Sequence, residues 1–114
     1  MTLFYNIEPY VADLVFIQGD TINMTFSVIQ NDVPYVMTGM QLDITFKRMD
    51  GKVIKQLSSA GGAPAIIILL DTFTIYTAGF NESGTLKYDV QVTDGADIET
   101  IMTGNALVKK EYTT

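Results

Sequence analysis

The chain has 114 residues, with seven basic against thirteen acidic side chains and no cysteine, histidine or tryptophan. A compact domain of this length removes roughly two-thirds of its unfolded surface from water, which is enough for one core without disulfides or a metal. The missing residue types exclude thiol nucleophiles, imidazole catalysis and Cys/His zinc sites. The net charge is −6, and we take it to be spread over the whole chain. Such a charge opposes binding to nucleic acid or to an anionic membrane.

Residues 1–13 are the first predicted element, an N-terminal arm or edge strand. Its apolar side chains include Leu3, Phe4, Tyr5, Ile7 and Tyr10, and alone it cannot bury three aromatic rings. Two alternatives remain open: an edge strand of its own domain, or an arm that adds to a neighbouring chain. The opening lacks the basic start and cleavage site of a signal peptide, so we expect a protein made in the cytosol.

Apolar residues then recur with a period of two, which is typical of half-buried strands. The clearest segments are residues 22–28, 40–48 and 85–93, with a weaker set over residues 98–108. The predicted core consists of the inward members of these strands: Ile22, Met24, Phe26, Val28, Leu42, Ile44, Phe46, Phe73, Ile75, Leu86, Tyr88, Val90 and Val108.

Turn signals separate these runs about every ten residues. Asp50-Gly51 and Asp94-Gly95 suit tight hairpin turns, and residues 58–64 form a predicted loop. The pattern predicts an all-β sandwich or small barrel, with seven to eight strands in two antiparallel sheets and less than a tenth of the chain in helices. No linker or repeat divides it, so residues 14–114 are expected to form a single β-sandwich domain.

Residues 64–70 are apolar on both faces of a strand and include Ile66, Ile68 and Leu70. One interpretation is a central strand covered on both sides. The other is a subunit interface, because such a strand on a free surface would promote aggregation. The run is too short to span a bilayer.

Candidate chemistry is sparse. Asp89, Asp94, Asp97 and Glu99 could pair as glycosidase carboxylates, but a sandwich of this size rarely provides the cleft, and solvated turn carboxylates are the simpler interpretation. Gly19-Asp20-Thr21 precedes a strand, so we expect a bend in which the Asp20 carboxylate accepts hydrogen bonds from backbone amides. The sequence predicts no enzyme, no catalytic residue, no cofactor and no metal site.

Four motifs, over about residues 14–113, nevertheless resemble those of a known family. The first motif consists of Gly19-Asp20-Thr21, the strand that follows it and the Met37-Thr38-Gly39 turn. The second is the Phe46–Gly51 hairpin, and the third is the strand that contains Tyr88-Asp89. The fourth consists of Gly104 and the closing residues 106–113. Together they resemble the N-terminal domain of upper baseplate proteins from phages of lactic-acid bacteria.

The resemblance implies an immunoglobulin-like β-sandwich that serves as a non-enzymatic attachment or adaptor module in a phage virion, in the baseplate, tail or fibre region. It implies structural roles for Gly19, Asp20, Thr21, Gly39, Tyr88, Asp89 and Gly104. Two alternatives are a capsid decoration or head-fibre attachment protein, and a carbohydrate-binding module.

Expected partners are other virion proteins or further copies of the chain in a trimer or hexamer, with no nucleic acid and no membrane. The expected location is the virion, assembled in the host cytoplasm. The predicted interface residues are Leu3, Phe4, Tyr5, Ile7, Tyr10, Ile66, Ile68 and Leu70.

Overall fold

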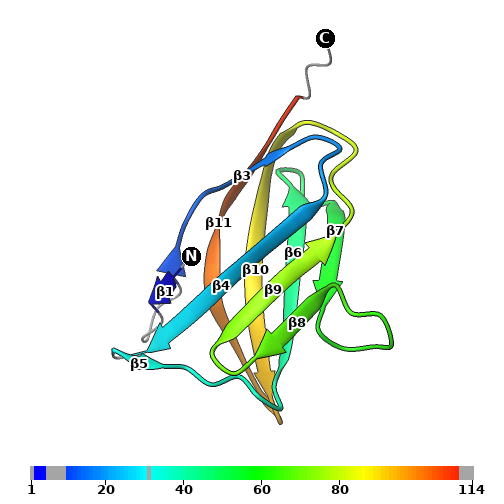
Figure 1. The fold of residues 1–114 in the computed structure, drawn as a ribbon. Coiled ribbons are helices and arrows are strands. Elements are labelled where there is room, and N and C mark those ends of the chain that lie inside the picture. The colour runs from blue at the N-terminus through cyan, green and yellow to red at the C-terminus, as the bar shows by residue number, and fades with distance from the viewer. Residues whose placement is uncertain (1, 5–9, 31, 111–114) are drawn as a thin grey trace.

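A computed structural model describes residues 2–4, 10–30 and 32–110, and their strands form two facing sheets (Figure 1). The five-stranded sheet has the order β1-β4-β9-β8, and β5 pairs with β4. Its strands are β1 (Thr2–Phe4), β4 (Ile22–Gln30), β5 (Val33–Pro34), β8 (Ile66–Leu69) and β9 (Thr72–Thr77). The described residues contain no helix, so none of them forms a helix able to cross a membrane.

The six-stranded sheet has the order β2-β11-β10-β6-β7, and β3 pairs with β11. Its strands are β2 (Tyr10–Val11), β3 (Leu14–Ile17), β6 (Gln41–Arg48), β7 (Val53–Ser58), β10 (Gly84–Asp94) and β11 (Asp97–Lys109). In Figure 1 this sheet lies behind the five-stranded one, and the chain leaves it at the upper end of β11.

The predicted all-β sandwich is confirmed, with two corrections. Eight strands have four or more residues, and the short strands β1, β2 and β5 raise the described total above the predicted seven to eight. The sheets are also mixed, because β1 runs parallel to β4, and β2 and β3 run parallel to β11. Alternation of apolar and polar residues along one strand indicates which face is buried. It does not indicate whether a partner strand distant in sequence runs parallel or antiparallel.

Both Asp-Gly hairpins are confirmed. Asp50-Gly51 joins β6 to β7 and Asp94-Gly95 joins β10 to β11, each glycine having a positive φ, +93° at Gly51 and +62° at Gly95. This conformation is inexpensive only for a residue without a Cβ. The predicted loop after Ser58 is confirmed too, since the next strand begins at Ile66.

The core lies between the sheets. Twelve of the thirteen predicted core residues are buried in it, and the thirteenth, Met24, is partly buried and packs against it. Phe26 and Phe73 stack across β4 and β9, with ring centroids 4.9 Å apart. The prediction missed ten other buried residues. Two of them are Phe16 and Phe80, whose rings pack against each other with centroids 5.3 Å apart. Phe80 belongs to the loop between β9 and β10, where no alternation marks a buried position.

The central-strand interpretation of residues 64–70 is wrong, because β8 is an edge strand that pairs only with β9 in the described sheet. Ile66 is completely buried in the chain's own core, which removes it from the predicted interface. Ile67 and Leu69, in contrast, are 53% and 69% exposed. With one neighbouring strand and one covered face, the outward residues of β8 have nothing in the described part of the chain to pack against.

The N-terminal segment contributes edge strands to its own domain. β1 pairs with β4 over Thr2–Phe4, and β2 pairs with β11 over Tyr10–Val11. This supports the edge-strand alternative for these residues. The predicted interface residues Tyr5 and Ile7 lie outside the described residues, as do the side chains of Leu3 and Phe4.

We predict that Phe26→Ala lowers the free energy of unfolding by about 3–5 kcal/mol, because it removes a buried ring and its stacking partner's contact. Tyr76→Ala is the matched control, since Tyr76 is an aromatic residue of the paired strand and is 63% exposed. Urea unfolding of both variants measures the difference. A loss below about 1 kcal/mol for Phe26→Ala would mean that the ring is not part of the core.

Candidate functional site

Gly19 and Asp20 form a tight turn between β3 and β4. The Asp20 amide donates to the carbonyl oxygen of Ile17 at 3.1 Å, and Gly19 has a φ of +85°. A glycine of positive φ at the third position is typical of a type II turn. The Asp20 carboxylate is exposed and has no hydrogen bond to any described residue, so its predicted capping role is wrong. Thr21 is exposed as well.

The backbone of this turn, rather than the aspartate side chain, makes the close contacts. The Gly19 amide donates to the carbonyl oxygen of Phe80 at 2.9 Å. A Cβ placed on the neighbouring Gly79 would lie 2.1 Å from the carbonyl oxygen of Asp20. The turn therefore locks the β3–β4 connection against the loop before β10 and holds Phe80 in the core.

Gly39 occupies an equivalent turn at the opposite end of the sandwich. The Met40 amide donates to the carbonyl oxygen of Met37 at 3.0 Å, and Gly39 also has a φ of +85°. Met37 is completely buried. The turn thus anchors the connection from β5 to β6 through a methionine in the core.

Tyr88 holds the N-terminal segment against the six-stranded sheet. Its hydroxyl donates to the carbonyl oxygen of Ala12 at 2.6 Å, and the Ala12 amide donates to the carbonyl oxygen of Thr103 at 3.0 Å. Burial raises the pKa of the Tyr88 hydroxyl, and the nearby Asp13 carboxylate raises it further. The phenol therefore stays protonated and keeps its donor role.

Gly104 makes this contact possible. It lies opposite Tyr88 in the β10–β11 register, and a Cβ on Gly104 would lie 1.9 Å from the carbonyl oxygen of Ala12. Any larger residue would push the segment between β2 and β3 away from the Tyr88 hydroxyl. Asp89, the next motif residue, is half-buried and has no hydrogen bond through its side chain within the described part of the chain.

The remaining predicted interface residues have different exposures. Leu70 is 59% exposed, whereas Ile68 and Tyr10 are partly buried and pack against the core. The prediction missed a second apolar surface formed by the outward residues Val11, Val15 and Leu107, of which Val15 and Leu107 are paired neighbours on β3 and β11. The alternation in residues 14–17 and 106–109 is the signal that could have found it.

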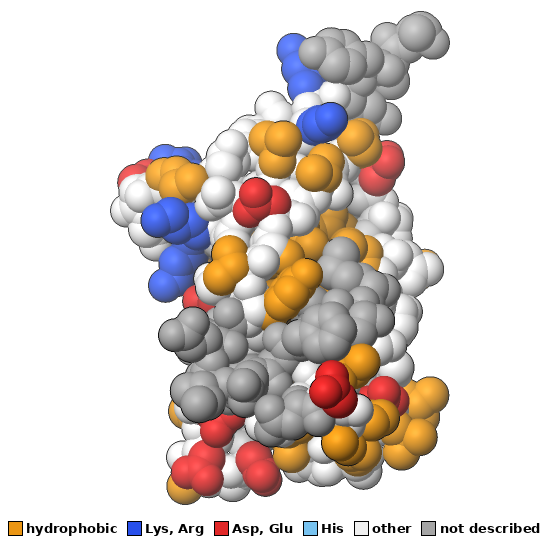
Figure 2. Space-filling view, turned by 90° about the vertical axis from the view of Figure 1, so that its left-hand side faces the viewer, with side chains coloured by type: hydrophobic (Ala, Val, Ile, Leu, Met, Phe, Trp, Pro, Cys, Tyr) orange, Lys and Arg blue, Asp and Glu red, His pale blue; other side chains and the backbone are white. Residues whose placement is uncertain are grey.

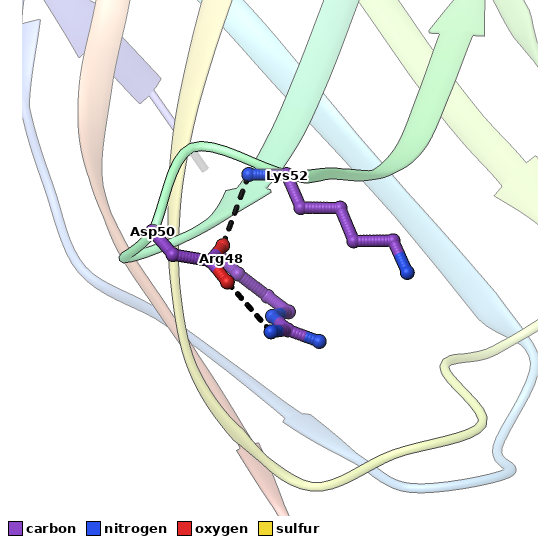
Figure 3. Close-up of polar contacts among 3 residues, drawn as sticks. All are labelled: Arg48, Asp50 and Lys52. Carbon is purple, nitrogen blue, oxygen red and sulfur yellow. Dashed lines mark hydrogen bonds and ion pairs between the residues drawn. The ribbon is translucent and has the colours of Figure 1, made fainter.

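The β6–β7 hairpin presents basic side chains around one acidic residue (Figure 3). The Asp50 carboxylate accepts a hydrogen bond from the Lys52 amide at 3.1 Å and forms an ion pair with the Arg48 guanidinium at 2.6 Å. The Lys52 amide, followed by the Arg48 side chain, lowers the pKa of Asp50. The aspartate therefore stays charged and fixes the turn.

A cavity of about 170 Å³ lies between this hairpin and the loop before β10. It is lined by Arg48, Lys52, Ile54, Lys55, Gly79, Phe80, Asn81 and Glu82. The Lys55 ammonium lies 5.7 Å from the centre of the Phe80 ring, within the range of a cation–π contact. Three basic side chains in this lining outnumber its one acidic side chain, Glu82, so the charge of the cavity favours an anionic group.

A smaller hollow of about 60 Å³ at the other end of the sandwich has acidic walls. It is lined by Tyr35, Val92, Asp94, Asp97 and Glu99. Burial raises the pKa of Tyr35, and the Glu99 and Asp94 carboxylates raise it further. Among the described residues, no three acidic side chains are arranged to hold a metal ion.

No protein-family model matches the sequence. No curated protein matches it either. Among solved structures, the chain is similar to the N-terminal domain of phage TP901-1 ORF48, with a TM-score of 0.52 and 13% sequence identity. The match covers 96% of this chain and 100% of that one. At this identity, the likeness shows that the two share a fold.

We predict that Tyr88→Phe destabilises the protein by about 1–2 kcal/mol, because the carbonyl oxygen of Ala12 loses its donor. Hydrogen exchange should quicken at the Ala12 amide more than at amides of β10. Tyr76→Phe removes an exposed hydroxyl from the outer face and should change neither quantity. Unchanged exchange at Ala12 in Tyr88→Phe would argue against the anchoring role.

A second pair of variants separates backbone from side chain at the β3–β4 turn. Gly79→Ala should destabilise the protein by about 1–3 kcal/mol, because its Cβ collides with the carbonyl oxygen of Asp20. Asp20→Ala should change stability by less than about 0.5 kcal/mol. Thermal unfolding of both variants tests this ordering, and the reverse ordering would restore the carboxylate's capping role.

Proposed function

We propose that this chain is a bacteriophage virion structural protein, a non-enzymatic attachment or adaptor module of the baseplate, tail or fibre region. The observation that carries the proposal is the likeness to the ORF48 domain over nearly the whole of both chains, the latter belonging to a baseplate protein. The ordered sequence motifs add support, because Gly19, Gly39, Tyr88 and Gly104 each occupy a position where the fold needs that residue.

The surface is consistent with a protein that binds other proteins. Its described surface has hollows of about 60 to 300 Å³, one of which is lined by Val15 and Leu107. Exposed aliphatic side chains lie on two separate sheet faces, at Ile67 and Leu69 and at Val15 and Leu107. Exposed apolar groups of this kind gain stability when a partner removes them from water.

The proposed partners are other virion proteins, with the chain present as a trimer or hexamer or bound to a multimeric assembly. The proposed contact residues are the predicted interface residues other than Ile66, namely Leu3, Phe4, Tyr5, Ile7, Tyr10, Ile68 and Leu70. Among those whose exposure is described, Leu70 is the most exposed. A place in the virion follows from the same proposal.

Capsid decoration and carbohydrate binding are the competing functions. A sugar-binding sandwich needs exposed aromatic rings, and among the described residues Tyr76 is the single aromatic that is mostly exposed. The position of antibody labels on phage particles distinguishes a head protein from a tail protein. A glycan array tests whether the protein binds sugars.

We expect antibodies against the purified protein to label particles of the phage that encodes it, at the tail tip or fibre region, by immunogold electron microscopy. Mass spectrometry of the purified particles should find the chain in several copies. Labelling of the head would favour the decoration alternative. Absence from the particles would overturn the proposal, and retention of a glycan by the monomer would favour the binding module.

A further inference from the structure

The charges of this acidic protein are separated between the two ends of the sandwich. All seven basic residues lie at or near the end that carries the β6–β7 turn, the start of β10 and the finish of β11. They are Lys47, Arg48, Lys52, Lys55, Lys87, Lys109 and Lys110, which we call the basic end. Three described acidic residues share this end, namely Asp20, Asp50 and Glu82.

The opposite end, which carries the β10–β11 turn, has six described acidic residues and no basic one. They are Asp32, Asp43, Asp71, Asp94, Asp97 and Glu99, which we call the acidic end. Strand register fixes this division, because Lys87 pairs with Lys47 near one end of β10 and Asp94 pairs with Asp97 at the other. In Figure 2 the blue side chains gather in the upper part of the molecule and most of the red ones in the lower part.

The two ends cannot neutralise each other within one molecule. Lys87 and Asp94 are seven residues apart on β10, which is about 23 Å along an extended strand. The Debye length at physiological salt is about 8 Å, so their attraction is screened. Arg48–Asp50 is the one ion pair in the described part of the chain. Lys52, Lys55, Asp94 and Asp97 therefore hold charges that no described residue pairs.

A second copy of this chain supplies the complementary charge. We propose that copies associate head to tail, with the acidic end of one molecule docked on the basic end of the next. The cavity lined by Lys52 and Lys55 receives carboxylates from the protruding β10–β11 turn, where Asp94 and Asp97 flank Gly95 and Ala96. Opposite potentials at such a contact set its orientation and speed encounter more than they add affinity.

A head-to-tail contact joins two different surfaces, so a pair of molecules keeps one free acidic end and one free basic end. Such contacts close into a ring if the rotation between neighbours permits it, and otherwise extend into a filament. This inference concerns how copies meet, and it stands whether or not the chain attaches to a virion.

Charge-reversed variants test the proposal with the full chain. In the first, Lys52→Glu and Lys55→Glu leave the basic end with five basic and five described acidic side chains, so its excess positive charge is lost. In the second, Asp94→Lys and Asp97→Lys leave the acidic end with four acidic and two basic side chains. Each variant weakens one end and leaves the other intact. We expect wild-type protein to show concentration-dependent sedimentation at 50 mM salt and to be a monomer at 500 mM. Each variant alone should associate at least tenfold more weakly than wild type, whereas an equal mixture of the two should form heterodimers.

Asp89→Lys is the control for a charge reversal away from both ends, because Asp89 lies midway along β10, opposite Thr45 and Thr103. It should associate like wild type, and circular dichroism and thermal unfolding should show that all variants are folded. If Lys55→Glu unfolds the protein by removing the contact with Phe80, Lys47→Glu with Lys52→Glu replaces the first variant. Monomeric wild type at low salt, or a mixture that behaves like its separate components, overturns the proposal.

Discussion

The contact between the Ala12 carbonyl oxygen, the Tyr88 hydroxyl and Gly104 is the constraint on which the closure of the sandwich depends. It fixes the segment between β2 and β3, and these strands in turn cover the β11 edge of the six-stranded sheet. On the far side of the segment, β1 joins the other sheet by pairing with β4. One stretch of chain thus belongs to both layers, and a single buried phenol with a facing glycine determines its path.

The same residues show why sequence motifs can be right about position and wrong about mechanism. Gly19, Gly39 and Gly104 are explained by backbone geometry, either a positive φ or a carbonyl group that leaves no room for a Cβ. Asp20, in contrast, contributes its backbone to the turn while its carboxylate faces solvent. Short polar residues suit such turns for several reasons, so their presence alone does not reveal which atom makes the contact.

Alternation and turn chemistry were enough to predict the sandwich, both Asp-Gly hairpins and 12 of the 22 core residues, because these are local properties of the chain. What failed was non-local. The edge position of β8 and the parallel pairing of β3 depend on partners far away in sequence. Phe80 lies in a loop, and its burial depends on contacts with distant residues such as Phe16. The assumption of evenly spread charge failed for the same reason: four of the seven basic residues lie between Lys47 and Lys55, and strand register then adds Lys87 beside Lys47.

The parallel pairing of β3 with β11 has a consequence for synthesis. Leu14 is opposite Ala106 and Ile17 is opposite Lys109, so the two partners are separated by 92 positions of chain. A ribosome presents β3 long before its neighbour exists, and the apolar side chains of β3 stay without that neighbour until β11 has been made. Topologies with such distant partners fold slowly and depend on the late segment. Completion of the domain therefore waits until β11 has emerged from the exit tunnel.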